Sequence, residues 1–399
     1  VQPHAVGHVS VPVLVSLAGR EGIPLRSKDR LASRSRIPVH DGRFEYLLQT
    51  DTLQLYELNV PCDHGSFYFI QFLPEAKGVR FEYSEAFEGE PIRMIAQGPL
   101  NRKRLERQAE ERARFKPRMD SILDAQERLD QDNLLFSEPY NELIRQIQSC
   151  TDQIMRQDLY RQMERMRTTG SCYTEQGRQL DDEYQALYRE QQRWLQEEAA
   201  RHADLPSFCR MMEELLHGQR MTTKQDAAEW IACYDRVFAD RFPGHPYHKR
   251  IESIRQSMKA GVGNRYIDFT LPDTEGTPTT LSEVIDGKVA VLDLWASWCG
   301  SCRNFSLGLI PLYEKYRDRG LVIVGVAREF KDTKDWHLAL ERDAYPWLNL
   351  LEMDDATQLW EQYGAGNAGG KVLLIDRNGK ILAVNPTHAE LEACLEELL

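Results

Sequence analysis

The stretch that decides the fold of this chain reads Val291-Leu292-Asp293-Leu294-Trp295-Ala296-Ser297-Trp298-Cys299-Gly300-Ser301-Cys302. Its first half is a short apolar run typical of a buried strand, and the cysteines that follow open a predicted helix. Cys299 then lies at the helix N-terminus, where unpaired backbone N–H groups and the helix dipole favour a thiolate. Cys302 follows one turn later. We therefore predict thiol-disulfide exchange, in which Cys299 attacks and Cys302 resolves the mixed disulfide.

Asp293 lies on the same predicted strand, six residues before Cys299 and beneath the cysteine pair. A carboxyl group in an apolar sheet can have a raised pKa, which would suit Asp293 to accept the proton of Cys302 as the mixed disulfide resolves. The alternative is a solvated carboxylate at the end of the strand, because Asp is usually exposed. Of the flanking tryptophans, Trp298 is the better candidate for contact with a partner, since Trp295 continues the buried strand.

Strand and helix patterns alternate around this stretch from Tyr266 onwards, which predicts an α/β domain with a central sheet. A hairpin is predicted around Asn378-Gly379. The predicted strands are Val289 to Trp295, Leu321 to Ala327, Lys371 to Asp376 and Lys380 to Val384, and the predicted helices are Cys302 to Arg319, Thr333 to Arg342 and Ala389 to Leu399.

The first two-thirds of the chain contain two regions of different pattern. Up to about Ala96, apolar and polar residues alternate with period two between turn signals, which predicts an antiparallel β domain or small sandwich. After Gly98-Pro99, apolar stripes at helical spacing run through charged sequence, whose mixed charges we interpret as solvated faces. The expected domains are a β-rich, sandwich-like domain at 1–98, a helical arm at 99–262 and the α/β domain at 263–399. The first region's strands are expected at Val9–Val15, Phe44–Leu47, Leu53–Tyr56 and Ser66–Ile70.

Composition narrows the range of partners. The 399 residues carry a net charge of −12, which disfavours a nucleic-acid partner, because binding phosphates needs a basic face. No apolar stretch reaches the roughly 18 residues that span a bilayer, so we expect no transmembrane segment in this chain. The chain begins at Val1 and not at Met, which is expected of a trimmed or mature form.

Among the eight cysteines, only Cys299 and Cys302 are closely spaced. Zinc ribbons and fingers need a second pair of ligands, so a single CxxC before a helix favours redox chemistry, and we predict no metal site. Of the other cysteines, Cys209, Cys233 and Cys394 are expected as small core residues, and Cys62 is expected as an exposed thiol. A disulfide between Cys150 and Cys172 could bridge two helices, provided that their Cα atoms lie within the narrow separation that a disulfide needs.

Further blocks of sequence accompany the cysteine pair, namely Ile267-Asp268-Phe269-Thr270-Leu271, Asp286-Gly287-Lys288-Val289, Leu312-Tyr313-Glu314-Lys315-Tyr316, Gly320-Leu321-Val322-Ile323-Val324-Gly325-Val326 and Leu374-Ile375-Asp376-Arg377-Asn378-Gly379-Lys380. With the Trp-Ala-Ser-Trp-Cys block, they resemble the TlpA/ResA-type thioredoxin-like thiol-disulfide oxidoreductases of the alkyl hydroperoxide reductase/thiol-specific antioxidant superfamily. The resemblance implies an enzyme with no cofactor beyond its redox-active disulfide, with protein thiol or disulfide clients and an upstream thiol electron donor. The preceding regions look like those of cell-envelope proteins of Gram-negative bacteria. This likeness implies a periplasmic or envelope location, often with a lipid anchor on an N-terminus that has been removed.

Three positions depart from the family pattern. Ser301 stands where Pro usually precedes the second cysteine, Phe305 where reductive members carry an acid, and Gly370 where a cis-proline faces the cysteines. The loop at 364–370 is therefore expected to be unusually pliable. Substrate contacts are expected at residues that flank the cysteine pair, namely Trp298, Gly300, Ser301, Gly369 and Gly370.

Two alternatives compete with a thiol-disulfide oxidoreductase. A redox-silent interaction module with a degenerate substrate-binding loop fits the three departures, but it has no physical need for both cysteines and Asp293. A one-cysteine peroxidase would want a lone cysteine preceded by Thr, whereas Trp298 precedes a CxxC here. The reduction potential of the cysteine couple would give the direction of flow, since about −270 mV indicates reduction and about −120 mV oxidation.

Overall fold

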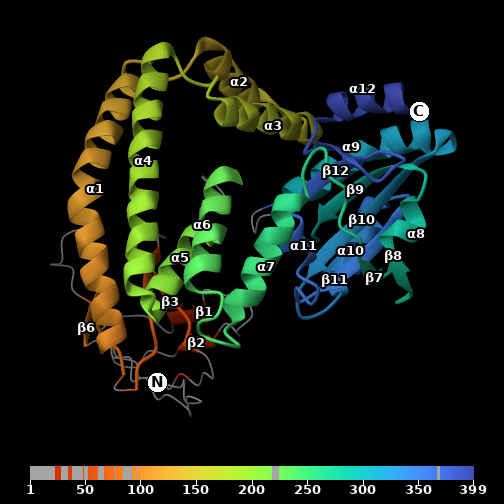
Figure 1. Cartoon of the computed structure of the whole chain (residues 1–399). Helices are drawn as coiled ribbons and strands as arrows, with labels where there is room; N and C mark the ends of the chain where they lie inside the picture. The colour runs from red at the N-terminus through yellow and green to blue at the C-terminus, as the bar shows by residue number, and fades with distance from the viewer. Residues whose placement is uncertain are drawn as a thin grey trace. The chain divides into compact units, whose positions relative to one another are not determined.

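The structure is a computed structural model that describes residues 23–27, 35–37, 48, 53–61, 67–76, 78–83, 92–96, 98–217, 224–365 and 369–399. The chain divides into two compact units, Val1–Ser121 with Gln185–His245 and Ile122–Tyr184 with Pro246–Leu399. The long helices α1 (Pro99–Gln131) and α4 (Glu175–His202) each have residues in both units (Figure 1). The helical region expected at 99–262 therefore contributes to both units.

The described strands of the first unit are antiparallel. They form a four-stranded sheet in the order β2-β1-β3-β4 and a separate pair, β5 with β6. The rings of Phe72 in β4 and Phe81 in β5 meet edge-on with centroids 5.4 Å apart, which joins the two sheets in one apolar core. These strands confirm the predicted antiparallel β domain, although the strands expected at Val9–Val15 and Phe44–Leu47 lie outside the described residues. The bounds are β1 (Ile23–Ser27), β2 (Ser35–Ile37), β3 (Tyr56–Pro61), β4 (Phe67–Phe72), β5 (Arg80–Tyr83) and β6 (Ile92–Ala96).

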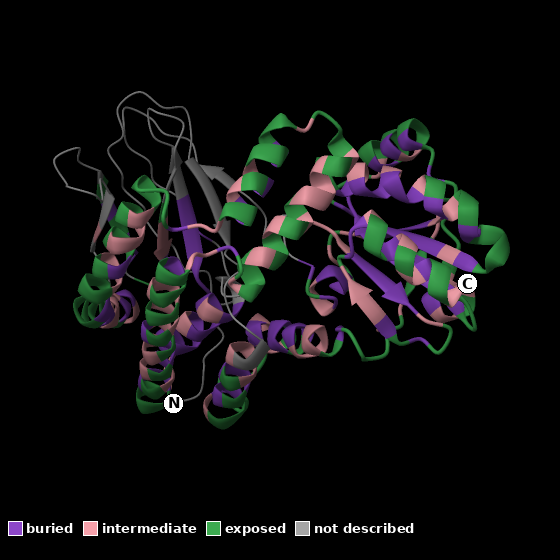
Figure 2. Ribbon diagram, turned by 90° about the horizontal axis from the view of Figure 1, so that it is seen from above, coloured by how far each residue is buried: buried purple, intermediate pink, exposed green. Residues whose placement is uncertain are grey.

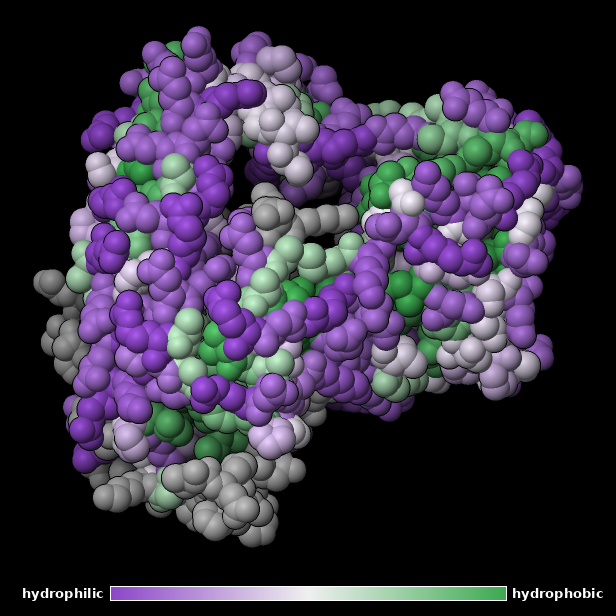
Figure 3. All heavy atoms as spheres, viewed as in Figure 1, coloured by the Kyte–Doolittle hydropathy of each residue, from purple (hydrophilic) through white to green (hydrophobic). Residues whose placement is uncertain are grey.

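Helices α1 and α4, with α5 (Leu205–His217) and α6 (Lys224–Val237), make up the helical part of the first unit. Phe115 of α1 and Trp194 of α4 pack edge-on with ring centroids 5.8 Å apart, so apolar stripes hold these helices together, as predicted. Hydrophilic residues cover most of the surface of α1 and α4 that is seen in Figure 3. The mixed charges of these helices therefore lie largely on solvated faces.

The second unit contains the helical pair α2 (Glu138–Ser149) and α3 (Gln153–Thr169), together with α7 (Pro246–Lys259). Helix α3 begins at the N-cap Asp152, whose carboxylate accepts the backbone N–H of Ile154 at 2.8 Å, and it ends at Gly170 in the left-handed conformation. Helix α3 packs against α2 and against α9 (Gly300–Tyr316), the helix that begins with the cysteine pair. Throughout the described residues, no helix is both long and apolar enough to cross a bilayer.

The thioredoxin-like domain is built on a five-stranded mixed sheet in the order β11-β10-β9-β12-β13. Strands β9, β10 and β11 are parallel, while β12 pairs antiparallel with β9 and with β13. All seven residues of β9 are buried, because the central strand of a sheet covered on both faces meets no solvent (Figure 2). The bounds are β9 (Val289–Trp295), α9 (Gly300–Tyr316), β10 (Leu321–Glu329), α10 (Lys334–Asp343), β11 (Leu348–Met353), α11 (Leu359–Gln362), β12 (Lys371–Ile375), β13 (Ile381–Val384) and α12 (His388–Leu398), preceded by β7 (Thr270–Pro272), β8 (Pro278–Thr280) and α8 (Leu281–Ile285).

Strand β11 and helix α11 were not predicted from the sequence, because polar residues interrupt the apolar run of β11. Glu352 is fully buried, and its carboxylate accepts the hydroxyl of Thr357 at 2.6 Å and the backbone N–H of Leu359 at 2.9 Å. Both bonds go to Oε1, so this oxygen of the buried carboxylate holds the start of α11.

Candidate active site

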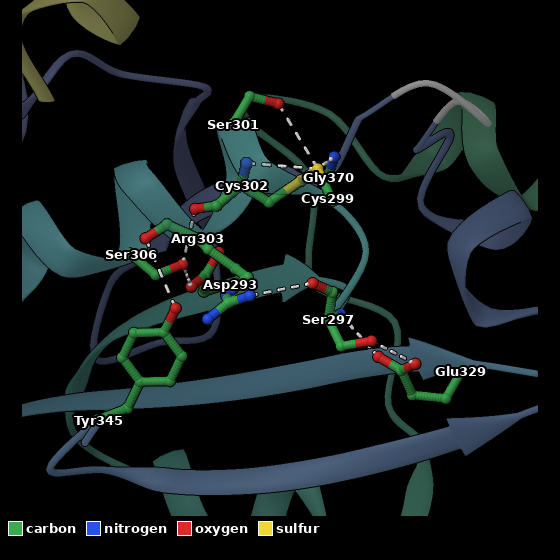
Figure 4. The surroundings of a disulfide bond; sticks show 10 residues. All are labelled: Asp293, Ser297, Cys299, Ser301, Cys302, Arg303, Ser306, Glu329, Tyr345 and Gly370. Carbon is green, nitrogen blue, oxygen red and sulfur yellow. Dashed lines mark hydrogen bonds between the residues drawn. A yellow bond between two sulfur atoms is a disulfide. The ribbon is translucent and has the colours of Figure 1, made fainter. Parts of the chain in front are cut away.

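The cysteine pair lies at the junction of β9 and α9, and Cys299 and Cys302 form a disulfide with their Cα atoms 5.3 Å apart (Figure 4). Cys299 is the N-cap of α9, as the sequence predicted. The exposed fractions of the two residues are 5% and 9%, so exposure does not single out Cys299 as the attacking sulfur in this state. The position of Cys299 at the start of α9 instead favours it as the attacking sulfur, because the helix dipole favours negative charge there.

Each sulfur of the disulfide faces a backbone N–H group. The N–H of Cys302 points to Cys299 Sγ at 3.3 Å, and the N–H of Gly370 points to Cys302 Sγ at 3.0 Å. The hydroxyl of Ser301 lies 3.5 Å from Cys299 Sγ and supplies a second polar neighbour to that sulfur. Donors of this kind stabilise a thiolate, so the site can hold negative charge on either sulfur once the disulfide opens.

Asp293 lies in the middle of β9 beneath the cysteine pair, as Figure 4 shows, and is 2% exposed. The alternative of a solvated carboxylate at the end of the strand is therefore wrong. Burial raises the pKa of Asp293 to about 6, against the opposing effects of a hydrogen bond from Ser306 and the nearby positive groups Arg161 and His388. The Ser306 hydroxyl donates to Asp293 Oδ2 at 2.5 Å and lies 3.0 Å from the carbonyl oxygen of Cys302.

A second buried carboxylate holds the loop before Cys299. The backbone N–H and the hydroxyl of Ser297 both donate to Glu329, each at 2.7 Å, and Glu329 is 3% exposed. Burial raises the pKa of Glu329 above its usual value, while the two bonds from Ser297 oppose that change. Glu329 was not predicted from the sequence, although the parallel pairing of β9 with β10 could have indicated that it lies near the cysteine loop. Trp295 pairs with Ala327, so the residues two positions further along each strand meet at one edge of the sheet.

Arg303 ties the first turn of α9 to the rest of the domain. Its guanidinium binds the Asp343 carboxylate with two bonds of 2.6 and 2.7 Å and donates to the carbonyl oxygen of Ser297 at 3.3 Å. The hydroxyl of Tyr345 also donates to Asp343, at 3.0 Å. This two-bonded ion pair keeps the cysteine loop in place from the side opposite to Glu329.

The residues predicted to contact substrate form a partly open rim around the disulfide. Trp298 is 47% exposed, Gly300 and Ser301 are exposed, and Gly369 and Gly370 are half-buried. Trp295, in contrast, is fully buried, as predicted. A pocket beside the rim is lined by Ser297, Trp298 and Arg303 on the cysteine side and by residues of α10 on the other, among them Asp335, Leu338 and Arg342.

Gly370 approaches the cysteine pair so closely that no side chain fits there. A Cβ atom at this position would overlap the carbonyl oxygen of Leu294 and lie 3.1 Å from Cys302 Sγ. Glycine at 370 therefore allows β12 to pair with the end of β9 and brings its N–H to the sulfur. The pliability expected for the loop at 364–370 concerns residues 366–368 above all, and these lie outside the described residues.

The described cysteines outside the pair form no disulfide. Cys150 and Cys172 are both free, so the structure contains no bridge between them. Cys209 and Cys233 are buried, as predicted, whereas Cys394 is half-buried at the edge of the core because only part of its helix faces inward. Cys62 lies outside the described residues.

Comparisons with known proteins match the C-terminal part of the chain. Residues 262–384 match the model of the AhpC/TSA family. The thiol:disulfide interchange protein DsbE of Allochromatium vinosum is 31% identical over 132 residues, which cover 32% of this chain and 68% of the relative. Thiol-disulfide oxidoreductase ResA of Bacillus cereus is 25% identical over 145 residues, which cover 35% of this chain and 80% of the relative.

Among solved structures, the chain is similar to the thioredoxin domain of a thiol-disulfide oxidoreductase from Bacteroides vulgatus. The identity is 28%, the match covers 34% of this chain and 96% of the other, and the TM-score is 0.32. The identity and coverage of the DsbE relative show that this chain belongs, through its C-terminal domain, to the family of thioredoxin-like thiol:disulfide interchange proteins that the relative represents, and the AhpC/TSA match covers the same domain.

Proposed function

We propose that this protein is a thiol-disulfide oxidoreductase that exchanges disulfides with protein clients through Cys299 and Cys302. One observation carries the proposal: both sulfurs lie at the start of α9 against backbone N–H groups, above a buried carboxylate that can take a proton. The names of the DsbE and ResA relatives support the same reaction. The cysteine pair itself gains and loses the two electrons of the reaction, so the proposal includes no metal and no organic cofactor.

The reaction is balanced by two sulfur substitutions. With the pair reduced, the Cys299 thiolate attacks a client disulfide, a mixed disulfide forms, and one client sulfur leaves as a thiolate. Cys302 then gives its proton to Asp293 and attacks Cys299 Sγ, so that the second client sulfur leaves and the Cys299–Cys302 disulfide forms. The client gains two electrons and the cysteine pair loses two. An upstream dithiol donor restores the reduced pair by the same steps in reverse, and an oxidising direction of flow uses these reverse steps on a client dithiol.

We further propose that the protein works outside the cytoplasm, in the periplasm or cell envelope of a Gram-negative bacterium. The likeness to DsbE of Allochromatium vinosum supports this location. A disulfide-forming compartment would also supply the clients that the reaction needs, since protein disulfides persist in oxidising environments and are rare in the cytosol.

A trapping experiment tests the proposed reaction. In the Cys302→Ser variant, Cys299 can attack but nothing resolves the product, so incubation of the reduced variant with insulin should give a stable mixed disulfide detected by mass spectrometry. The matched Cys299→Ser variant should trap far less, because Cys302 lies one turn inside the helix. Equal absence of adducts in both variants, with no insulin reduction by the unmodified protein, would instead support the redox-silent interaction module.

Trp298 provides a prediction about client binding. Its half-exposed ring lines the pocket between the cysteine loop and α10, so Trp298→Ala should lower kcat/KM for insulin reduction about tenfold, as removal of a central interface tryptophan typically does. The rate with bis(2-hydroxyethyl) disulfide, which has only eight heavy atoms and cannot reach across the pocket, should change less than about twofold. Leu123→Ala is the control, since Leu123 is exposed to a similar extent on α1. Equal losses with both substrates would contradict the docking role.

A further inference from the structure

Helix α3 lies against α9 so closely that it depends on a glycine. A Cβ atom at Gly308 of α9 would lie 2.8 Å from Ile154 Cγ2 of α3 and would overlap His388 Nε2. Real Cβ atoms essentially never make contacts this short, so a side chain at position 308 would push α3 or His388 away. The packing of α3 on the cysteine-bearing helix is therefore built into the sequence of α9.

Polar contacts fix the position of α3. Asp158 of α3 accepts the backbone N–H of His388 at 3.2 Å and lies 3.1 Å from the ring Nδ1 of the same residue. The other ring nitrogen of His388 lies 3.0 Å from the carbonyl oxygen of Phe305 in α9. Both ring nitrogens thus face oxygen atoms, so the ring of His388 links α3 to α9. On the solvent side, Arg165 pairs with Glu390 of α12.

Arg161, one turn before Arg165, points toward the cysteine helix. Its guanidinium lies 3.4 Å from the ring centroid of Phe305 and donates to the carbonyl oxygen of Pro386. Burial lowers the pKa of Arg161 to about 10, which leaves the side chain charged at neutral pH. Phe305 directly precedes Ser306, the residue that donates to Asp293. Arg161 therefore contacts the residue next to Ser306 in α9, and the same Phe305 ring stacks on His388 with ring centroids 4.1 Å apart.

The charges around Asp293 come from several elements. Arg161 of α3 and His388 of α12 are its positive neighbours, and both lower the pKa of Asp293 against the effect of burial. Ser306 of α9 supplies a neutral hydrogen bond, and the phenol of Tyr345 also interacts electrostatically with Asp293. Arg161 thus brings a permanent positive charge from a helix that lies far from β9 and α9 in the sequence.

We propose that Arg161 is a positioning residue for the exchange reaction, and that its cation keeps Asp293 ionised and ready to take the proton of Cys302. The inference rests on the proposed function of the cysteine pair. The proton leaves Cys302 Sγ for an Asp293 oxygen as the sulfur attacks Cys299, and Asp293 later releases it to solvent. Helix α3 is on this account part of the reaction machinery and not only a spacer.

The test compares three variants of the full chain in insulin reduction between about pH 5 and about pH 8. Arg161→Met should move the acid limb of the rate profile up by about one pH unit, because Asp293 then loses a nearby opposite charge, and the rate near pH 6 should fall several-fold. Arg161→Lys should restore most of the original profile. Arg165→Met removes an exposed ion pair of the same helix and should leave the limb in place.

An unmoved acid limb in a folded Arg161→Met protein would overturn the inference while leaving the proposed function intact. A second measurement distinguishes failure of this inference from failure of the proposed function. The carboxyl carbon of Asp293, followed by NMR in the same variants, reports its titration without any turnover. If the unmodified protein shows no exchange, the proposed function fails, and the Asp293 titration alone decides whether Arg161 acts on it. A titration that Arg161→Met does not move overturns the inference in that case as well.

Discussion

Replacing Asp293 with asparagine should make this protein more stable at neutral pH and much slower in disulfide exchange. The stability effect follows from the pKa of Asp293, which burial raises from 3.8 to about 6. Above that pH the folded protein holds a buried carboxylate. Each pH unit between the unfolded and folded pKa values destabilises the folded state by about 1.4 kcal/mol, and thus by about 3 kcal/mol in all. Asparagine carries no charge, and its carbonyl oxygen can still accept the Ser306 hydroxyl, so this destabilisation disappears.

The pH dependence has a definite sign. Because the folded pKa is raised, the folded state binds more protons than the unfolded state between about pH 4 and about pH 6, and stability falls as the pH rises through this window. Asp293→Asn should therefore match the unmodified protein near pH 4 and exceed it increasingly up to about pH 7. Urea unfolding across this range measures the difference. The exposed Asp286→Asn variant is the control and should show no such trend.

The activity of Asp293→Asn should change in the opposite direction. Asparagine cannot accept the proton of Cys302, and loss of a general base typically slows a reaction about a hundredfold or more. The mixed disulfide should consequently accumulate during insulin reduction, and the rate should lose the acid limb near pH 6. A variant that is more stable yet equally active would show that Asp293 has no part in proton transfer. The gain in stability would then come without a loss of activity at this site.

The second large effect is expected at Gly370, where Gly370→Ala should destabilise the protein by about 1–3 kcal/mol, the typical cost of overpacking. The added methyl group would overlap the carbonyl oxygen of Leu294, which belongs to the backbone and cannot rotate away. Strand β12 must then move from the end of β9, and the N–H of Gly370 must leave Cys302 Sγ. Exchange should slow as well, since that N–H stabilises charge on the resolving sulfur.

Gly369→Ala is the matched control for this prediction. A Cβ atom at Gly369 meets nothing within 4 Å, so the same substitution one residue earlier should leave stability within about 0.5 kcal/mol. Thermal unfolding and insulin reduction measure both variants. If Gly370→Ala unfolds at the same temperature as Gly369→Ala, the close approach of β12 to the cysteine pair does not occur in solution.

The local pattern of the sequence was a good guide to the thioredoxin-like domain. The strand predicted at Val289 to Trp295 is β9 to the residue, and Cys299 begins the helix that follows it. Both features depend on residues close together in the chain, namely an unbroken apolar run and the residue types at a helix start. Strand β11 was missed because Asn349 and Glu352, both buried, interrupt the apolar pattern that identifies a strand.

The candidate site was predicted in part. The cysteine pair, the burial of Asp293 and the exposure of Trp298 followed from their places on a strand, at a helix start and in the connecting loop. The residues that hold these groups in place were not found. Glu329 acts from the neighbouring strand, and Arg161 acts from a helix 132 residues before Asp293 in the chain.

The sequence by itself determined where the reactive sulfurs lie and which carboxyl group lies beneath them, because neighbours in the chain set strand, turn and helix start. Only the tertiary structure decided the charge around that carboxyl group and the space beside the sulfurs. Arg161 and Gly370 act through packing between segments far apart in the chain, and such contacts leave no periodic signal in either segment.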